Sequence, residues 1–239
     1  MVSEGGGEAI AGAVAAGFRE RQPAGGENDA PRAQDAGARV DFKAVIAEIQ
    51  ALKPEVVLNT LNGDSNLHFF RALKGAGLGK LPVMSFSVDE NLLQAIGKDA
   101  FHPEHYAAWS YFMSLPGEAN QRFVAAFKMR FGAKRVTSDP MEAAYAGVYL
   151  WAQEVRGAGR SDPALINRAL INSSMAAPSG ILAMDRTTRH LWKQAHVGKA
   201  RADGQFVVVW SSGDLIQPEP FPGLHSYAEW QQLLKETGQ

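Results

Sequence analysis

Residues 41–97 alternate between segments with helical spacing of apolar residues and short apolar runs rich in β-branched residues. A helix is predicted over 41–52, where apolar residues recur every three or four positions and Lys53-Pro54 ends the pattern. Strands are predicted over Glu55–Asn59 and Leu81–Ser87, followed by helices over 65–74 and 89–96. Helices and strands that alternate with short connections are typical of a parallel sheet with crossover helices, so we expect an α/β fold.

Short polar side chains lie where each of these two strands ends. Asn59, Thr60 and Asn62 follow the first strand, and Ser85 and Ser87 close the second. Because crossovers between parallel strands are right-handed, both loops are expected at the same edge of the sheet, facing one crevice. Small ligands bind in α/β sheets at this position. Neutral donors and acceptors favour a small, neutral, polar ligand over catalysis.

Two acidic residues, Asp89 and Glu90, begin the helix after the second strand. Acids at this position are first interpreted as helix-capping groups. Because they border the same crevice, they are also candidate acceptors for ligand N–H groups. The predicted ligand-binding set is therefore Asn59, Thr60, Asn62, Ser85, Ser87, Asp89 and Glu90.

The rest of the chain is predicted to contain more helices and a β-rich carboxyl-terminal segment. The helix over 141–155 is apolar almost all round, so it requires cover on most of its surface. Ala202-Asp203-Gly204 predicts a hairpin turn before the last strand. The other predicted elements are helices over 118–131, 163–171 and 227–235, and strands over 106–113, 180–185, 190–197 and 205–211.

Composition excludes several classes of function. The 239 residues carry a formal net charge of −1, which gives no basic surface for nucleic acid, and no apolar run reaches the length of a membrane span. The absence of cysteine removes disulfides and thiolate metal sites. Residues 1–39 are rich in Gly, Ala and charged residues and are expected to be disordered, with a short helix possible over Glu8–Glu20. As written, the chain has no export signal.

No catalytic motif is present, and neither a metal nor a cofactor is expected. Gly75-Ala-Gly-Leu-Gly79 follows a helix rather than a strand, which excludes a dinucleotide-binding loop. His102 and His105 are interpreted as part of a polar loop rather than as metal ligands. Asp139 and Glu142 are interpreted as a helix start close to a capping box.

Several motifs resemble the periplasmic substrate-binding proteins of urea and short-chain amide ABC transporters. The resemblance runs from about Val40 to the carboxyl terminus. The motifs that carry it are Leu58-Asn-Thr-Leu-Asn-Gly-Asp-Ser-Asn66, Pro140-Met-Glu-Ala-Ala-Tyr145, Ala177-Pro-Ser-Gly180, His190-Leu-Trp-Lys193, Ala202-Asp-Gly-Gln-Phe206 and Pro218-Glu-Pro220.

The resemblance implies a partial type I periplasmic-binding fold, in which two α/β lobes close on a ligand by a hinge. Residues 40–138 would form the later part of lobe two, 139–180 the return segment of lobe one, and 181–239 the hinge and lobe-two strands with the carboxyl-terminal segment. The implied ligand is urea or a short aliphatic amide, and the implied partner is an ABC permease. The implied location is the periplasm, although the chain as written would stay in the cytoplasm. The alternative is a cytoplasmic amide-sensing regulator that acts through a protein partner.

The family's first half, which carries the sheet of lobe one, has no counterpart in this sequence, and residues 1–39 resemble nothing in the family. We therefore expect an amino-terminally truncated chain. In the family, the helix over 141–155 packs on the lobe-one sheet. Without that sheet an apolar surface is left open, so the chain is expected to aggregate or to depend on a partner.

Overall fold

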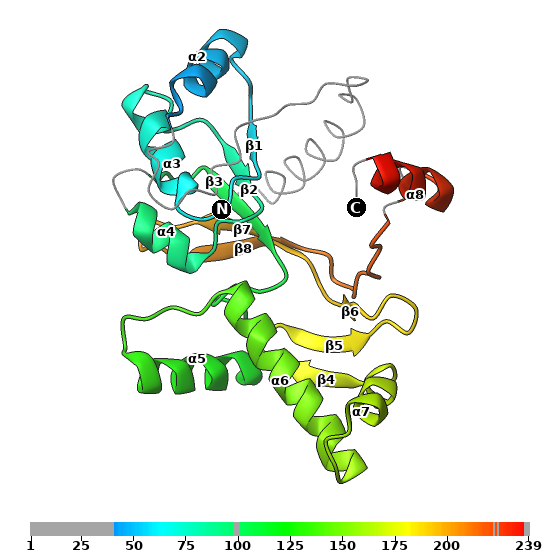
Figure 1. The fold of residues 1–239 in the computed structure, drawn as a ribbon. Coiled ribbons are helices and arrows are strands. Elements are labelled where there is room, and N and C mark those ends of the chain that lie inside the picture. Colours follow the sequence, from blue (N-terminus) through cyan, green and yellow to red (C-terminus); the bar gives the residue numbers. More distant parts are fainter. Residues whose placement is uncertain (1–40, 98–100, 222, 224, 237–239) are drawn as a thin grey trace.

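The computed structural model describes residues 41–97, 101–221, 223 and 225–236. The expected disorder of residues 1–39 and the helix considered over Glu8–Glu20 lie outside the described residues. The described chain forms two units, one above the other in Figure 1. We call them the sheet unit, which contains five strands and α2–α4, and the helical unit, which contains α5–α7 and three short strands.

The sheet unit is a mixed five-stranded sheet in the order β1-β2-β3-β7-β8. β1, β2 and β3 are parallel, as the sequence predicts, while β7 runs antiparallel to β3 and β8 antiparallel to β7. α2, α3 and α4 connect to the parallel strands and lie together on one side of the sheet (Figure 1). The bounds are α2 Lys43–Leu52, β1 Val57–Asn59, α3 Ser65–Gly75, β2 Val83–Ser85, α4 Glu90–Ile96, β3 His105–Trp109, β7 His196–Ala200 and β8 Phe206–Ser211.

The largest core lies between this sheet and its helices. Phe69, Phe70 and Leu73 on α3 bury their side chains against Val83 and Ala107 of the central strands. Leu73 follows Phe69 by four residues and Phe70 by three, so the three side chains share the face of the helix that meets the sheet. Burial of such side chains, at about 1.5–3 kcal/mol each, supplies most of what holds the helices in place.

The helical unit packs three helices around a small antiparallel sheet of order β4-β5-β6. Its core includes Ala146 on α6, Ala177 on β4 and Leu182 on β5. α8, with no buried residue, follows the last strand as a separate closing helix. The bounds are α5 Glu118–Phe131, α6 Asp139–Ala158, α7 Pro163–Leu170, β4 Ser174–Ala177, β5 Gly180–Met184, β6 Leu191–Trp192 and α8 Tyr227–Glu236.

Two segments connect the units. The first crossing segment, residues 110–117, leaves the end of β3 and leads into α5, and the second, residues 193–195, returns from β6 to β7. The prediction of one strand over 190–197 is therefore wrong: β6 and β7 belong to different sheets, and the chain crosses between units where they separate. Lys193 pairs within this crossing with Ile216 in an isolated bridge.

β4 is a strand that the sequence did not predict. Ser174–Ala177 is short and lacks an alternating apolar pattern, so its sequence gives no strand signal. It pairs along its whole length with β5, from Ser174 opposite Ala183 to Ala177 opposite Gly180. The hairpin partner therefore determines this strand, and its own residues do not.

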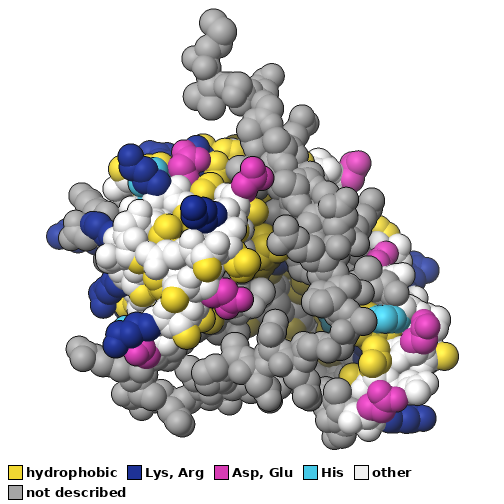
Figure 2. Space-filling view, turned by 90° about the horizontal axis from the view of Figure 1, so that it is seen from above, with side chains coloured by type: hydrophobic (Ala, Val, Ile, Leu, Met, Phe, Trp, Pro, Cys, Tyr) yellow, Lys and Arg dark blue, Asp and Glu magenta, His cyan; other side chains and the backbone are white. Residues whose placement is uncertain are grey.

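Charges on the sheet unit are mixed. Seen from above, the Lys and Arg side chains of the described residues lie among Asp and Glu side chains (Figure 2). None of the helices in the described ranges is long and apolar enough to cross a membrane.

Gly198 on β7 provides a test of the sheet-unit core. A Cβ atom added at Gly198 would lie 2.6 Å from the Phe112 ring, which is fully buried and also packs on Phe206. We expect Gly198→Ala to lower the free energy of unfolding by about 1–3 kcal/mol because the ring has no room to move. Urea denaturation measures this. Gly75→Ala is the matched control, since a Cβ there meets nothing within 4 Å; equal losses in both variants would contradict the packing argument.

Candidate functional site

The two polar loops lie at one edge of the sheet, as their sequence predicted. β1 and β2 are adjacent and parallel, with Asn59 opposite Ser85. The Phe86 N–H donates to the Asn59 carbonyl at 3.0 Å, so the pairing continues one residue beyond the end of β2. The loops after β1 and β2 therefore leave the sheet side by side, at the end that faces the first crossing segment.

Asn59 is the centre of a buried hydrogen-bond network in these loops. Its Nδ2 donates to Asn66 Oδ1 at 2.7 Å and to Ser85 Oγ at 3.1 Å, and its Oδ1 accepts from the Leu61 N–H at 3.0 Å. Ser87 Oγ also donates to the Leu61 carbonyl. Asn59, Ser85 and Asn66 are all buried. Their polar atoms fix the loop conformation, because an unpaired buried polar group costs about 1–3 kcal/mol.

The other predicted site residues divide by exposure. Thr60 and Asn62 are exposed at the tip of the first loop, while Ser87 and Asp89 are half-buried in the second. Asp89 caps α4 by accepting from the Leu92 N–H at 2.8 Å, which is the capping role expected from the sequence. The structure thus brings the seven residues to one region, with some of them inside the loops and others at the surface.

Glu90 lies behind the second loop and is only 1% exposed. Its Oε1 accepts from the Met113 N–H in the first crossing segment at 2.7 Å, and its Oε2 has no partner. Burial, followed by the nearby carboxylates of Asp89 and Asp139, raises the pKa of Glu90 to about 8. The carboxyl is therefore mostly protonated near neutral pH.

The start of α6 is built differently from the predicted capping box. Ser138 is the N-cap residue but makes no side-chain capping bond, and Asp139 instead accepts from the Ser110 N–H at 3.0 Å. Burial raises the pKa of Asp139 above its usual value, with Glu142 contributing and Lys193 opposing. The first turn of α6 thus holds the first crossing segment, and the capping-box interpretation is wrong because both acids are used in contacts with other segments.

Glu142 is fully buried and joins three parts of the chain. Its Oε1 accepts from Ser179 Oγ at 2.7 Å, in the turn between β4 and β5, and its Oε2 lies 3.3 Å from Lys193 Nζ in the second crossing segment. Sequence reasoning missed this contact because the partners are 37 and 51 residues away. A fully buried carboxylate requires such partners.

Tyr111 combines a buried ring with a hydrogen-bonded hydroxyl. Its ring is fully buried, and its hydroxyl is 2.8 Å from both Asn120 Oδ1 and Thr137 Oγ1. Asn120 also donates to the carbonyls of Met113 and Leu115, which fixes the first crossing segment to α5.

His102 and His105 bond within the 102–105 segment, but the expectation of a polar loop is wrong for His105, which is the buried first residue of β3. His105 Nδ1 accepts from the His102 N–H, and His102 Nδ1 accepts from the Glu104 N–H, both at 3.2 Å. Burial lowers the pKa of His105 to about 4, so its ring is neutral at physiological pH. Within the described ranges, no three His, Asp or Glu side chains converge as metal ligands do.

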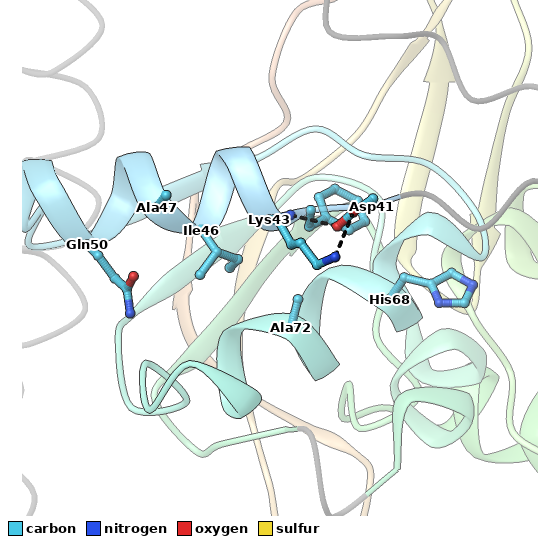
Figure 3. Close-up of a pocket in the computed structure, with 8 residues that line it drawn as sticks. Asp41, Lys43, Ile46, Ala47, Gln50, His68 and Ala72 are labelled. Carbon is cyan, nitrogen blue, oxygen red and sulfur yellow. Dashed lines mark hydrogen bonds and ion pairs between the residues drawn. The ribbon is translucent and has the colours of Figure 1, made fainter.

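Two large cavities of the described residues lie away from these loops. A shallow pocket of about 690 Å³ lies between α2 and α3, where Asp41 and Lys43 form a largely exposed ion pair and His68 points along the rim (Figure 3). A groove of about 530 Å³ lies between α5, α6 and β4. Phe123, Tyr145 and Tyr149 line it in close ring contact, with centroids 4.7 and 4.4 Å apart along the series. The groove is lined mainly by aromatic and aliphatic side chains, and the polar groups of the pocket between α2 and α3 are not among the predicted site residues.

The sequence model of one protein family, the periplasmic binding protein domain, matches residues 35–227 of this chain. The chain belongs to the periplasmic binding protein family. Its α/β architecture, with a mostly parallel sheet and a β-rich carboxyl-terminal segment, is a partial type I periplasmic-binding fold, which confirms the predicted fold class.

Solved structures of solute-binding proteins share this fold. A benzoate-bound protein of an R. palustris ABC transporter superimposes with a TM-score of 0.66 at 22% identity, over 77% of this chain and 50% of that one. An amino-acid transporter protein from Pseudomonas fluorescens gives 0.67 at 17% identity, over 77% and 51%. A leucine-binding protein from Thermotoga maritima gives 0.62 at 16% identity, over 73% and 49%. The chain thus spans about half the length of these proteins.

A limonene hydroxylase of Geobacillus stearothermophilus is 34% identical over 116 residues, which is 48% of this chain and 21% of that protein. This short match leaves most of that protein without a counterpart here.

The ion pair of Glu142 and Lys193 gives a prediction for the junction between the units. Lys193→Met leaves a fully buried carboxylate without its cation, so we expect the free energy of unfolding to fall by about 3–5 kcal/mol. Adding Glu142→Gln to Lys193→Met should recover part of this loss. The exposed pair Arg122 and Glu118 is the control, where Arg122→Met should cost less than about 1 kcal/mol. Chemical denaturation measures all four chains; losses of equal size at both pairs would contradict the prediction.

Proposed function

We propose that this chain is part of a solute-binding protein of an ABC transporter and that it captures urea or a short aliphatic amide. The observation that supports this is the chemistry of the two strand-end loops. Residues 59–64 and 85–90 contain no Lys, Arg or His, and their polar side chains are neutral hydrogen-bonding groups and acids. A carboxylate ligand is bound most strongly where a cationic side chain is present, whereas an amide offers N–H donors and one carbonyl acceptor that such loops match.

The proposal gives the loop residues two roles. Thr60, Asn62 and Ser87, which are exposed or half-buried, would contact the ligand, and Asp89 would accept from its N–H groups. Asn59 and Ser85 would position the loops, because their polar atoms already bond to each other and to the neighbouring backbone. The loops would then need little reordering when a ligand binds, which reduces the entropy cost of binding.

In this proposal the complete protein acts in the periplasm, where its two lobes close on the amide and deliver it to a membrane permease. The carboxyl-end loops of the sheet unit would be one wall of the binding cleft. Among the similar structures, one is a complex with benzoate and another is a protein that binds leucine, isoleucine, valine, threonine and alanine. The absence of a basic residue from both loops here is the reason for proposing a neutral ligand instead.

Calorimetric titration tests the ligand. We expect the 239-residue chain to release heat with acetamide or urea at millimolar concentration and to release none with benzoate. Asn62→Ala should weaken the binding about 2–10-fold, since a hydrogen bond contributes about 0.5–1.5 kcal/mol. Lys74→Ala, at the far end of α3, is the control and should leave the affinity unchanged. A folded sample that binds benzoate but neither amide would rule out the amide proposal.

A second candidate is an amide-sensing regulator that acts through a protein partner. The observation that favours it is an apolar surface on the helical unit. On α6, Val148 is 63% exposed and Trp151 47%, and on α5 Phe131 is 58% exposed. We call these three residues, with the α5–α6 groove, the open helical face. An exposed apolar surface of this kind is typical of protein–protein contact sites.

The open helical face predicts self-association of the isolated chain. Trp151→Glu should shift sedimentation toward the monomer, because a charge on this face costs desolvation on contact. The melting temperature should stay nearly the same, since the side chain is half exposed in the folded chain. Arg156→Glu, near the end of the same helix, serves as the control for a change of charge alone. A wild-type chain that is already a monodisperse monomer would refute the expectation of aggregation or partner dependence.

A further inference from the structure

The first crossing segment is held from both units within four residues. At its start, the Ser110 N–H donates to Asp139 on α6 at 3.0 Å, which is a contact with the helical unit. Phe112 turns the other way and buries its ring in the core of the sheet unit, against Phe206. Next in the chain, the Met113 N–H donates to Glu90 on α4. The boundary between the units therefore passes through these residues.

Contacts to the helical unit fix the other side of the same backbone. The Tyr111 hydroxyl bonds to Asn120 and Thr137, and Asn120 Nδ2 donates to the Met113 carbonyl at 3.1 Å. The backbone of Met113 is thus bonded to α5 through its carbonyl and to α4 through its N–H. The bond from the Met113 N–H to Glu90 consequently spans the boundary, and a rotation of one unit against the other acts directly on it.

Glu90 is an unusual residue for this position because it is buried without a counter-charge. The titratable groups that face it are Asp89 on its own helix, Asp139 on α6 and the Tyr111 hydroxyl on the crossing segment, so each is either acidic or neutral. No ion pair of Glu90 with Lys, Arg or His is present among the described residues. Its Oε2 has no hydrogen-bond partner there either.

Ionisation of such a carboxyl requires solvent. Burial and the acidic neighbours disfavour the carboxylate more than the hydrogen bond from the Met113 N–H favours it, so the pKa of Glu90 is raised to about 8. The charged form is stabilised if water reaches Oε2, and water reaches it when α4 separates from the crossing segment. Protonation of Glu90 therefore favours contact between α4 and the first crossing segment. By linkage, this contact in turn favours protonation of Glu90.

We propose that Glu90 is a proton-controlled latch between the sheet unit and the helical unit. In its protonated form it holds the Met113 N–H and keeps the arrangement of Figure 1. In its ionised form it draws in water, releases Met113 and frees the units to move about the first crossing segment. The latch goes beyond the proposed function, since it is a property of the free chain and requires no ligand.

Hydrogen–deuterium exchange of peptides that cover residues 110–116 tests the latch. Rates between pH 6 and 9.5 are converted to protection factors, which removes the intrinsic effect of base on exchange. We expect protection in wild type to fall by up to about tenfold for each pH unit between pH 6 and 8, where Glu90 is ionised in the open form and still protonated in the closed form, and to level off above about pH 8. The pH at which the fall levels off is the midpoint of Glu90 ionisation in the closed form. Glu90→Gln keeps an oxygen acceptor for the Met113 N–H but cannot ionise, so its protection should be independent of pH.

Asp139→Asn provides a second, independent readout. It removes a nearby negative charge and retains a side-chain oxygen for the Ser110 N–H. The midpoint at which the fall in protection levels off should therefore move to lower pH, because Glu90 ionises more easily once Asp139 is neutral. Glu118→Gln, an exposed change on α5, is the control and should leave the midpoint in place.

The latch is overturned if wild-type protection does not depend on pH, if Glu90→Gln loses protection as wild type does, or if Asp139→Asn leaves the midpoint unmoved. If Glu90→Gln does not fold, the comparison of wild type with Asp139→Asn decides. None of these measurements uses an amide, so a failed latch and a failed amide proposal give different results.

Discussion

The placement of the two units depends on the buried carboxylate of Glu142. This one side chain, in the first turn of α6, bonds to the β4–β5 turn through Ser179 and to the second crossing segment through Lys193. One turn earlier, Asp139 holds the first crossing segment at Ser110. Both connections between the units are therefore fixed to the same helix start. Loss of Lys193 or Ser179 as a partner would leave the Glu142 charge buried away from water. The contact therefore restricts the positions of these segments more strongly than its net contribution to the free energy of unfolding suggests.

The strand-end loops show how the sheet unit builds a polar surface without leaving polar groups unpaired. Asn59 uses all of its amide hydrogen-bonding atoms on neighbouring groups of the protein, which fixes the backbone of the loops. Thr60 and Asn62 remain exposed beside this fixed network. A rigid inner layer with free groups outside it is the arrangement that a selective small-ligand site requires. The acids of the second loop belong to the same region, where Asp89 caps α4 and Glu90 contacts the crossing segment.

The helical unit is apolar on two sides, and only one of them is covered. Ala146 and Leu150 of α6 are buried, while Val148 and Trp151 on the same helix are exposed. The sequence predicted this difficulty, since the helix over 141–155 is apolar almost all round. The chain also spans about half the length of the solute-binding proteins that share its fold. These observations are the reason that both candidate functions include contact with another protein.

Local sequence determined the elements and the region of the site. Apolar spacing gave the helices over 118–131 and 163–170 nearly residue for residue, and the alternation of helices and strands gave the parallel part of the sheet with Asn59 beside Ser85. These features depend on residues close in the chain. Tertiary structure alone decided that β4 is a strand, that the chain crosses units at Lys193, and that Glu142 and Glu90 bond to distant segments instead of capping helices. A short strand takes its conformation from its partner, and a buried acid takes its protonation state from its surroundings, so neither is determined by the residues next to it in sequence.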